Sequence, residues 1–102
     1  MNLSFLDEAE AEVESARTFL NERSHRLGRR FLDELGSTLD AIAARPESFP
    51  RLETLPDDSV YRRALLSTFR YAVFFEILPD EIVVIAVAHT SREPNYWIDR
   101  HV

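Results

Sequence analysis

Residues 71–89 read YAVFFEILPDEIVVIAVAH, and this stretch decides the fold. Two apolar runs, 71–78 and 82–89, flank the tripeptide Pro-Asp-Glu. Proline presets one backbone dihedral angle and aspartate hydrogen-bonds to the nearby backbone, so the tripeptide predicts a tight turn between two antiparallel strands. The second run begins IVVIAVA and has no polar side. It therefore predicts a strand in the middle of a sheet with both faces covered.

Two further strands are expected outside this hairpin. Residues 60–66 (VYRRALL) have strand composition and lead directly toward it. Residues 2–6 (NLSFL) alternate apolar and polar side chains, as a short half-buried strand does. The sequence thus predicts four strands, one at the start of the chain and three in its second half.

Between these strands, apolar residues recur at the spacing of helices. Residues 8–22 and 24–44 each carry an apolar side chain every three or four positions, which predicts two helices. The members of the two stripes are Ala9, Val13, Ala16, Leu20, Leu27, Phe31, Leu35, Leu39 and Ile42. A tight turn within residues 21–25 would make these helices an antiparallel hairpin.

Local signals indicate where the helices begin and end. Asp7 followed by Glu10 resembles a capping box, and acids in the first turn also suit the helix dipole. Ser24 is a candidate cap for the second helix. Pro46 disfavours the helical conformation at the residue before it, so that helix is expected to end near residue 44. The acidic run 8–14 predicts a solvated helix face.

Two segments lack a regular pattern. Residues 46–59 hold three prolines and two adjacent aspartates, which predicts an irregular connector. Residues 93–102 predict a tail or a short helix opened by Pro94. The whole order predicts a single α+β domain over residues 1–102, with a small antiparallel sheet packed against the helical hairpin.

Composition excludes several classes of function. Cysteine is absent, which removes disulfides, thiolate catalysis and thiolate metal sites. No apolar run approaches the ~20 residues of a membrane helix. The N-terminus carries acids where a signal peptide has its positive flank, so a cytoplasmic protein is expected. The three histidines are far apart, and neither a metal site nor another cofactor is expected.

The charge of the chain is acidic and uneven. The formal net charge is −6, and every basic residue is an arginine because the sequence has no lysine. Residues 1–58 hold 13 acidic and seven basic side chains, whereas residues 59–102 hold five of each. A chain with this balance has no general attraction for nucleic acid, so any contact with RNA or DNA must be local.

Polar residues near the strand ends are candidates for a functional site. Because the second strand of a meander begins near the end of the third, Arg70 and His89 are expected at one rim of the sheet. Arg92 and the aromatic pair Tyr96 and Trp97 follow in the tail above that rim. Arginine binds phosphate bidentately, histidine exchanges a proton near neutral pH, and aromatics stack on bases. Such a site is able to promote attack of an RNA 2′-hydroxyl on its phosphate, with His89 or Tyr96 moving the proton.

Each of these residues also has a purely structural interpretation. A single histidine at a strand end is often a hydrogen-bonded structural group. Arg92 beside Glu93 is consistent with a solvated ion pair. Tyr96 and Trp97 are consistent with rings that cap the core while their polar atoms reach outward. Both interpretations stay open at the level of the sequence.

Residues 62–97, RRALLSTFRYAVFFEILPDEIVVIAVAHTSREPNYW, resemble the RelE/ParE superfamily of toxins from type II toxin–antitoxin modules. Many members are described as plasmid stabilisation proteins. The preceding segments L-x-x-x-F-L-x-x-L and A-x-x-P-x-x-x-P, at residues 27–35 and 43–50, also fit this superfamily. The resemblance covers nearly the whole chain. It implies a small sheet against a helical hairpin, the architecture that the periodicity indicates independently.

The resemblance also implies a function. Members of the superfamily are toxins held inactive by a small cognate antitoxin, so a toxin–antitoxin hetero-oligomer is expected. RelE-like members cut messenger RNA on the ribosome, whereas ParE-like members poison DNA gyrase. In a nuclease, the resemblance would assign catalytic roles to Arg70, His89, Arg92 and, more loosely, Tyr96. In either case Arg62, Arg63 and Trp97 are expected to contact the target or the antitoxin.

The chain departs from the nuclease pattern in two ways that bear on the choice between these targets. RelE-like enzymes use lysines, which this chain lacks, and they are usually strongly basic, whereas this chain is acidic. A protein that docks into ribosomal RNA benefits from positive charge. The sequence therefore favours a toxin that inhibits gyrase by binding. The alternatives are a ribosome-dependent mRNA endonuclease and a decayed toxin that retains only antitoxin binding.

Overall fold

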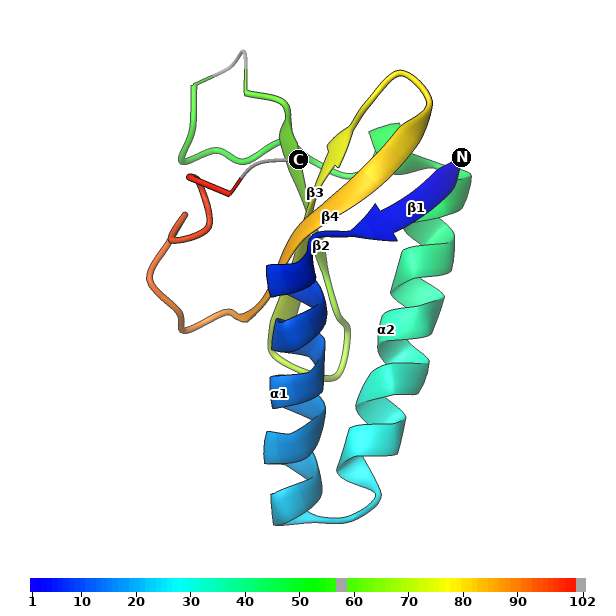
Figure 1. The fold of residues 1–102 in the computed structure, drawn as a ribbon, viewed down its shortest axis with the longest axis vertical. Coiled ribbons are helices and arrows are strands. Elements are labelled where there is room, and N and C mark those ends of the chain that lie inside the picture. Colours follow the sequence, from blue (N-terminus) through cyan, green and yellow to red (C-terminus); the bar gives the residue numbers. More distant parts are fainter. Residues whose placement is uncertain (57–58, 101–102) are drawn as a thin grey trace.

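The computed structural model describes residues 1–56 and 59–100, and it contains the two helices and four strands that the sequence predicts (Figure 1). The element bounds agree with the prediction to within about three residues, and the start of α2 differs most. In chain order they are β1 (Asn2–Phe5), α1 (Asp7–Arg23), α2 (Leu27–Ala44), the short 3₁₀ helix η1 (Pro46–Ser48), β2 (Tyr61–Leu65), β3 (Tyr71–Ile77) and β4 (Glu81–His89). The α+β class is confirmed. The described part of the tail, residues 93–100, forms turns and no helix.

The sheet is mixed rather than antiparallel. Its strand order is β1-β4-β3-β2, and β3 runs antiparallel to both of its neighbours. The first strand pairs in parallel with the last, with Phe5 opposite Val84. The expected purely antiparallel sheet is wrong on this point, because local patterns carry no information on the direction in which distant strands pair. The expected central position of β4 is confirmed.

A β-bulge shifts the side-chain alternation of β4. Phe74 pairs with Ala86 and Phe75 pairs with Val84, so Ile85 is an extra residue in β4. A bulge of this kind shifts the side-chain alternation by one position. As a result Val84 and Val87 belong to the cluster on one face of the sheet, while Ile85 and Ala86 belong to the cluster on the other. The IVVIAVA segment has no polar side because both faces of β4 are covered, each by one of these clusters.

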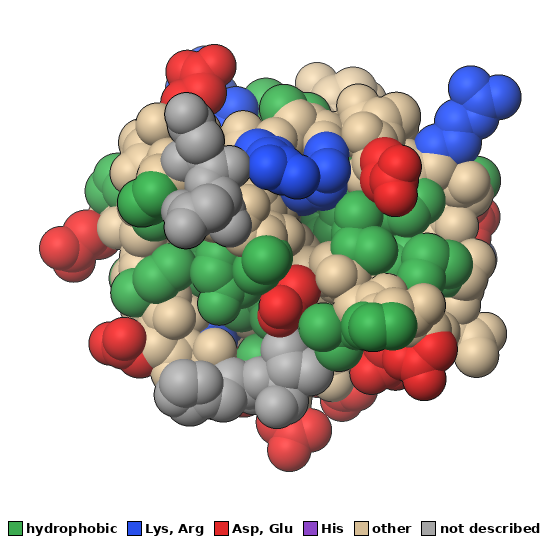
Figure 2. All heavy atoms as spheres, turned by 90° about the horizontal axis from the view of Figure 1, so that it is seen from above, with side chains coloured by type: hydrophobic (Ala, Val, Ile, Leu, Met, Phe, Trp, Pro, Cys, Tyr) green, Lys and Arg blue, Asp and Glu red, His purple; other side chains and the backbone are tan. Residues whose placement is uncertain are grey.

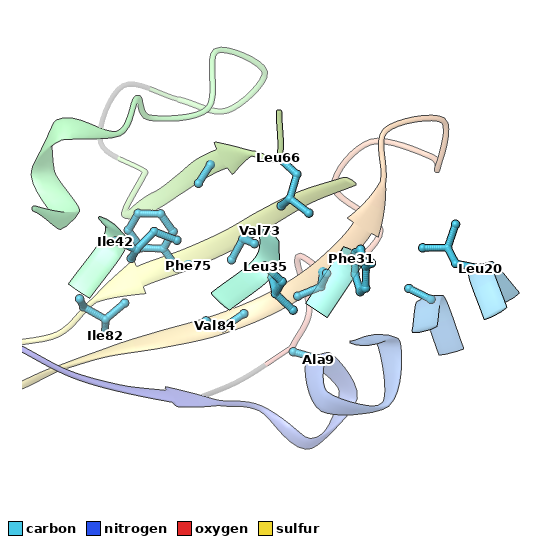
Figure 3. Close-up of a cluster of buried hydrophobic side chains, with 13 residues drawn as sticks. Ala9, Leu20, Phe31, Leu35, Ile42, Leu66, Val73, Phe75, Ile82 and Val84 are labelled. Atoms are coloured by element: carbon cyan, nitrogen blue, oxygen red, sulfur yellow. The ribbon is translucent and has the colours of Figure 1, made fainter. Parts of the chain in front are cut away.

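The helical hairpin covers one face of the sheet. From α2, Phe31 and Ile42 are fully buried, and from α1 the small residue Ala9 is fully buried. Figure 3 shows these side chains between the helices and the strands, with Ile42 beside Phe75 and Ala9 on the α1 side of the cluster. The ring of Phe31 lies 5.8 Å from that of Phe69 and 5.0 Å from that of Tyr71. This aromatic contact attaches α2 to the start of β3.

The connector and the tail cover the opposite face. Figure 1 shows both segments on the side of the sheet away from α2. Leu52 from the connector and Trp97 from the tail pack on Ile85. The indole ring of Trp97 lies 4.9 Å from the ring of Phe74 and 5.0 Å from that of Tyr61. This second cluster therefore depends on two segments without regular structure.

Neither predicted side-chain cap forms at the start of a helix. Asp7 is already the first residue of α1, whose N-cap is Leu6, and no side chain caps it. The predicted capping box is therefore wrong, although the acids in the first turn still suit the helix dipole. Ser24 does not cap α2 either. It ends α1 by donating its N–H to the carbonyl of Leu20 (3.1 Å), and Arg26 is the N-cap of α2.

A close approach of the two helices fixes their turn. The N–H of Gly28 donates to Oδ1 of Asn21 at 3.0 Å. A Cβ atom added at Gly28 would lie only 2.3 Å from that oxygen. A larger residue at position 28 would displace the Asn21 side chain and press on the carbonyl of Arg17 at 3.0 Å, whereas Gly36 later in α2 has no neighbouring heavy atom within 4 Å of such a Cβ.

Candidate functional site

A groove of about 190 Å³ opens on the face that the tail covers, and we name it the tail groove. Its floor is formed by small residues on β3 and β4, Ala72 and Ala88. Arg63 and Leu65 of β2 line one side, and residues 92–97 of the tail line the other. Five of the seven predicted site residues line this groove, namely Arg63, His89, Arg92, Tyr96 and Trp97.

The other two predicted residues lie outside the groove lining. Strand pairing places Tyr71 opposite His89, and the N–H of Thr90 donates to the carbonyl of Arg70 at 2.8 Å. The backbone of Arg70 is thus at the expected rim, but its exposed side chain does not line the groove. The guanidinium of Arg62 donates to the carbonyls of Phe49 (2.7 Å) and Glu47 (3.3 Å). Arg62 therefore anchors the connector, and its expected contact with the target or the antitoxin stays a prediction.

Trp97 is a core residue. Only 1% of its surface is exposed, because Phe74 and Tyr61 pack against the ring. Its expected contact with the target or the antitoxin stays a prediction, and the buried ring offers little surface for it. Its interpretation as a ring that caps the core agrees with the structure, and it reaches the groove only as part of the wall.

His89 is held by a local hydrogen-bond arrangement. The backbone N–H of Ser91 donates to Nδ1 of the imidazole at 3.1 Å, and the hydroxyl of Ser91 lies 2.7 Å from the same nitrogen. Since Nδ1 accepts a hydrogen bond, the proton of the neutral ring lies on Nε2. The ring also packs edge-on against Tyr71 at 5.2 Å. His89 is therefore a hydrogen-bonded, half-buried residue at the strand end.

Tyr96 is bonded away from the groove. Its hydroxyl donates to the carboxylate of Glu12 on α1, and its ring lies under the guanidinium of Arg92 at 4.0 Å. Burial and the hydrogen bond to Glu12 raise the pKa of Tyr96 to about 12. The hydroxyl is therefore protonated near neutral pH.

Glu12 and Arg100 form an ion pair that the sequence did not reveal. Nη1 of Arg100 lies 2.7 Å from Oε1 of Glu12, with 18% and 16% of the two side chains exposed. The acidic run 8–14 was expected to be a solvated face, and this is wrong for Glu12. One signal was present, because Glu12 lies three residues after Ala9 and four before Ala16, on the buried stripe. Arg100 has no comparable signal in the tail.

A second groove of about 300 Å³ lies between α1 and the end of β4, and we name it the helix groove. Ser15, Ala16 and Phe19 line it from α1, and Val87 lines it from β4. Phe19 is 48% exposed, with the guanidinium of Arg23 4.6 Å from its ring centre. The two grooves share Ala88, His89 and Arg92. They are therefore neighbours separated by the end of β4.

The surface charges match the acidic composition. Figure 2 looks down on the end of the molecule with the β3–β4 turn, where arginines are few and lie apart from one another among acidic, apolar and other side chains. That face offers no continuous basic surface. Within residues 1–56 and 59–100 no three histidine or acidic side chains are grouped to hold a metal ion. In the same two ranges, neither helix is long and apolar enough to cross a membrane.

The architecture and the site together define the class of protein. A helical hairpin packed against a small sheet is the arrangement implied for toxins of the RelE/ParE superfamily. A family model described as "ParE toxin of type II toxin-antitoxin system, parDE" matches residues 3–94. The chain belongs to this toxin family.

A solved structure shows the same fold. The "Chromosomal ParDE TA system from P. aeruginosa" aligns with a TM-score of 0.75 and 12% sequence identity, over 87% of this chain and 95% of that chain. At this identity the likeness concerns the fold alone. No curated protein matches the sequence.

Proposed function

We propose that this ParE-family toxin arrests growth in the cytoplasm by binding DNA gyrase, and that it does not cut RNA. The observation that carries the proposal is the state of Tyr96. A general base must accept a proton near the operating pH. Tyr96 instead donates to Glu12, and its pKa is raised to about 12.

The other candidate for proton transfer is also engaged. Nδ1 of His89 accepts from the backbone of Ser91, so it has no free lone pair for a substrate hydroxyl in this arrangement. Nε2 is then a donor in the neutral ring. Arg63 and Arg92 remain as groups that contact an acidic partner surface without chemistry. A binding function requires no more than this.

Charge supports the same choice of target. A net charge of −6 without any lysine opposes docking into ribosomal RNA, whose phosphates favour basic proteins. The alternative that the sequence left open, a ribosome-dependent mRNA endonuclease, would have to overcome this repulsion. A protein target such as gyrase carries no such uniform negative field.

Induction of the toxin followed by two measurements tests the proposal. Gyrase inhibition predicts filamentous cells and trapped gyrase–DNA complexes with intact messages, and His89→Gln should leave the potency unchanged. A nuclease predicts mapped 5′ ends at ribosome-engaged codons, and a loss of roughly 10²–10⁴-fold in rate for His89→Gln. Abundant ribosome-dependent cleavage would overturn the proposal.

Arginine variants test the tail groove as the contact surface. The double variant Arg63→Ala, Arg92→Ala should fold normally and lose toxicity, because both side chains are exposed and line the groove. Arg29→Ala is the matched control, since Arg29 lies on α2 in an exposed ion pair with Asp33. Equal toxicity of the double variant and the control would contradict the assignment. A wild-type chain that is not toxic at all would indicate a decayed toxin.

We further propose that a cognate antitoxin covers the helix groove. From α1 the groove is lined by the apolar residues Ala16 and Phe19 together with the polar residues Glu12 and Ser15, and Phe19 is 48% exposed. Co-expression with the antitoxin should raise the melting temperature, because a ligand that binds only the folded state stabilises it. Phe19→Glu should abolish copurification, whereas Leu32→Glu, at a 36% exposed position of α2, should not. Copurification that survives Phe19→Glu would place the antitoxin elsewhere.

A further inference from the structure

The edge of β4 is covered by side chains where its neighbouring strand ends. The last backbone hydrogen bond next to β1 runs from Leu6 N–H to the carbonyl of Val84 at 3.0 Å. Beyond it, the carbonyl of Ile85 accepts from Nη1 of Arg100 at 3.0 Å, and the N–H of Val87 donates to Oε1 of Glu12 at 3.1 Å. Two charged side chains thus take the place of a strand along this part of the edge.

Glu12 is the centre of this arrangement. Its two carboxylate oxygens accept from Arg100 at 2.7 Å and 3.1 Å, and the hydroxyl of Tyr96 donates to Oε2. Hydrogen bonds in which one or both groups are charged are stronger than neutral ones. A single carboxylate on α1 therefore joins three parts of the molecule: the helix, the central strand and the tail.

The tail fixed in this way is a wall of the tail groove. Residues 92–97 all line that groove, so their position sets its width. Two guanidiniums lie near the ring of Tyr96: that of Arg92 is 4.0 Å from the ring centre and that of Arg100 is 5.2 Å from it. Arg92 packs on Tyr96, and Tyr96 is hydrogen-bonded to Glu12. The position of Arg92 beside the groove therefore depends on Glu12.

We propose that Glu12 is a positioning residue for the tail groove. Through Tyr96 and Arg100 it holds the tail against β4, a contact that we call the latch. The latch in turn sets the position of Arg92. The latch itself is a property of the isolated toxin. Only its consequence for target binding rests on the proposed gyrase inhibition. Neither Glu12 nor Arg100 faces the target directly in this account.

Hydrogen exchange on the purified toxin tests the latch without any target. In Glu12→Gln the amide of Val87 and the tail amides of Ile98 and Arg100 should exchange at least about tenfold faster, the size expected when a charge-assisted bond is lost. The amide of Val73, in the middle of β3, should keep its rate. Glu10→Gln removes the same charge from an exposed position of α1 and should change none of these rates.

The pattern of rates decides between a latch and a general loss of stability. A purely structural role would speed the exchange of Val73 and of the tail by similar factors, and that result would overturn the proposal. Tail amides in Glu12→Gln that exchange within about twofold of the wild-type rate would also overturn the proposal. Arg100→Gln should reproduce the effect of Glu12→Gln, and the double variant should add little, because both changes open the same contact.

The binding consequence is measured separately with purified gyrase. Glu12→Gln should weaken the affinity at least about tenfold while circular dichroism shows an intact fold, and Glu10→Gln should bind as the wild type does. Wild-type affinity in a variant whose tail exchanges fast would refute the positioning role. If the wild-type toxin itself does not bind gyrase, the proposed function fails, and the exchange rates still decide whether the latch exists.

Discussion

The two faces of the sheet are covered by different means. On one face, α1 and α2 lay regular apolar stripes over β3 and β4, and the buried side chains there are all apolar. On the other face, an irregular connector and a tail supply a few large side chains, of which Trp97 is the largest. Polar contacts such as the one between Glu12 and Arg100 hold the tail in place.

This difference indicates that one face mainly stabilises the protein and that the other mainly binds its target. The helix-covered face obtains its energy from the burial of close-packed apolar surface, which tolerates little change. The tail-covered face holds the groove with Arg63 and Arg92, and its walls depend on side-chain hydrogen bonds. We therefore expect changes on the first face to unfold the protein. Changes on the second should alter its binding first.

The largest effect is expected at Phe31, which is fully buried under the helices. Phe31→Ala should lower the free energy of unfolding by about 3–5 kcal/mol, because the cavity adds to the lost burial. Leu32→Ala, at the next position of α2 and 36% exposed, should cost far less. Urea denaturation of both variants measures the difference. Similar losses in the two would show that the helix-covered face does not dominate stability.

The turn between the helices gives the next largest effect. Gly28→Ala should destabilise the protein by about 1–3 kcal/mol, since its Cβ would displace the Asn21 side chain from its hydrogen bond and crowd the carbonyl of Arg17. Gly36→Ala should instead stabilise by up to about 1 kcal/mol, because alanine favours the helix and the space is open. Thermal melts of the two variants should therefore shift in opposite directions. A stabilised Gly28→Ala variant would contradict the close approach.

The helix-covered face was predictable because its signals are periodic. Phe31, Leu35 and Ile42 recur at helical spacing, and the Pro-Asp turn marks the β3–β4 hairpin. Packing that repeats along an element leaves a pattern in the sequence. The bounds of both helices and the central place of β4 follow from that pattern.

The tail-covered face was less predictable because its contacts are not periodic. The ion pair of Arg100 with Glu12 joins residues 88 positions apart, and no sequence pattern around either residue indicates its partner. The bulge at Ile85 and the parallel pairing of β1 with β4 likewise depend on tertiary packing. The candidate residues His89, Arg92 and Tyr96 were found through their place at a strand end and through family resemblance. Their hydrogen-bond partners were not.

Alkaline titration probes the tail-covered face directly. The pKa of Tyr96 is raised to about 12 by burial and by Glu12, and burial also raises the pKa values of Tyr61 and Tyr71. A raised pKa means that the folded state holds the proton more tightly. This stabilisation is complete below the unfolded value near 10 and is lost as the pH rises toward 12.

Melting temperatures from pH 9 to 12 and absorbance of the ionised phenol measure this effect. The wild type should lose stability steadily above about pH 10. In Tyr96→Phe the melting temperature should fall less steeply with rising pH. The absorbance titration of this variant should lack the phenol that ionises at the highest pH. If Tyr96→Phe titrates and melts with the same pH dependence as the wild type, the contact with Glu12 does not hold Tyr96 in solution.

The smallest effect is expected from Glu34, the polar contact of the helix-covered face. Its carboxylate accepts from the backbone N–H of Thr68 at 2.7 Å and of Phe69 at 3.3 Å, which ties α2 to the loop before β3. Partial burial would raise the pKa of Glu34, but the hydrogen bonds from Thr68 and Phe69 outweigh it and lower the pKa. A lowered pKa stabilises the folded state above the unfolded value, and this contribution disappears as the pH falls through the folded pKa.

Glu34→Gln should therefore lower the melting temperature slightly at neutral pH and should match the wild type more closely in acid, where the carboxyl is protonated. Glu22→Gln, at an exposed position of α1, is the control for a simple loss of charge. Since Glu34 holds only a loop while Glu12 holds the wall of the groove, Glu34→Gln should leave gyrase binding unchanged. A variant that loses binding without losing stability would place the β2–β3 loop, and with it Arg70, in the contact surface.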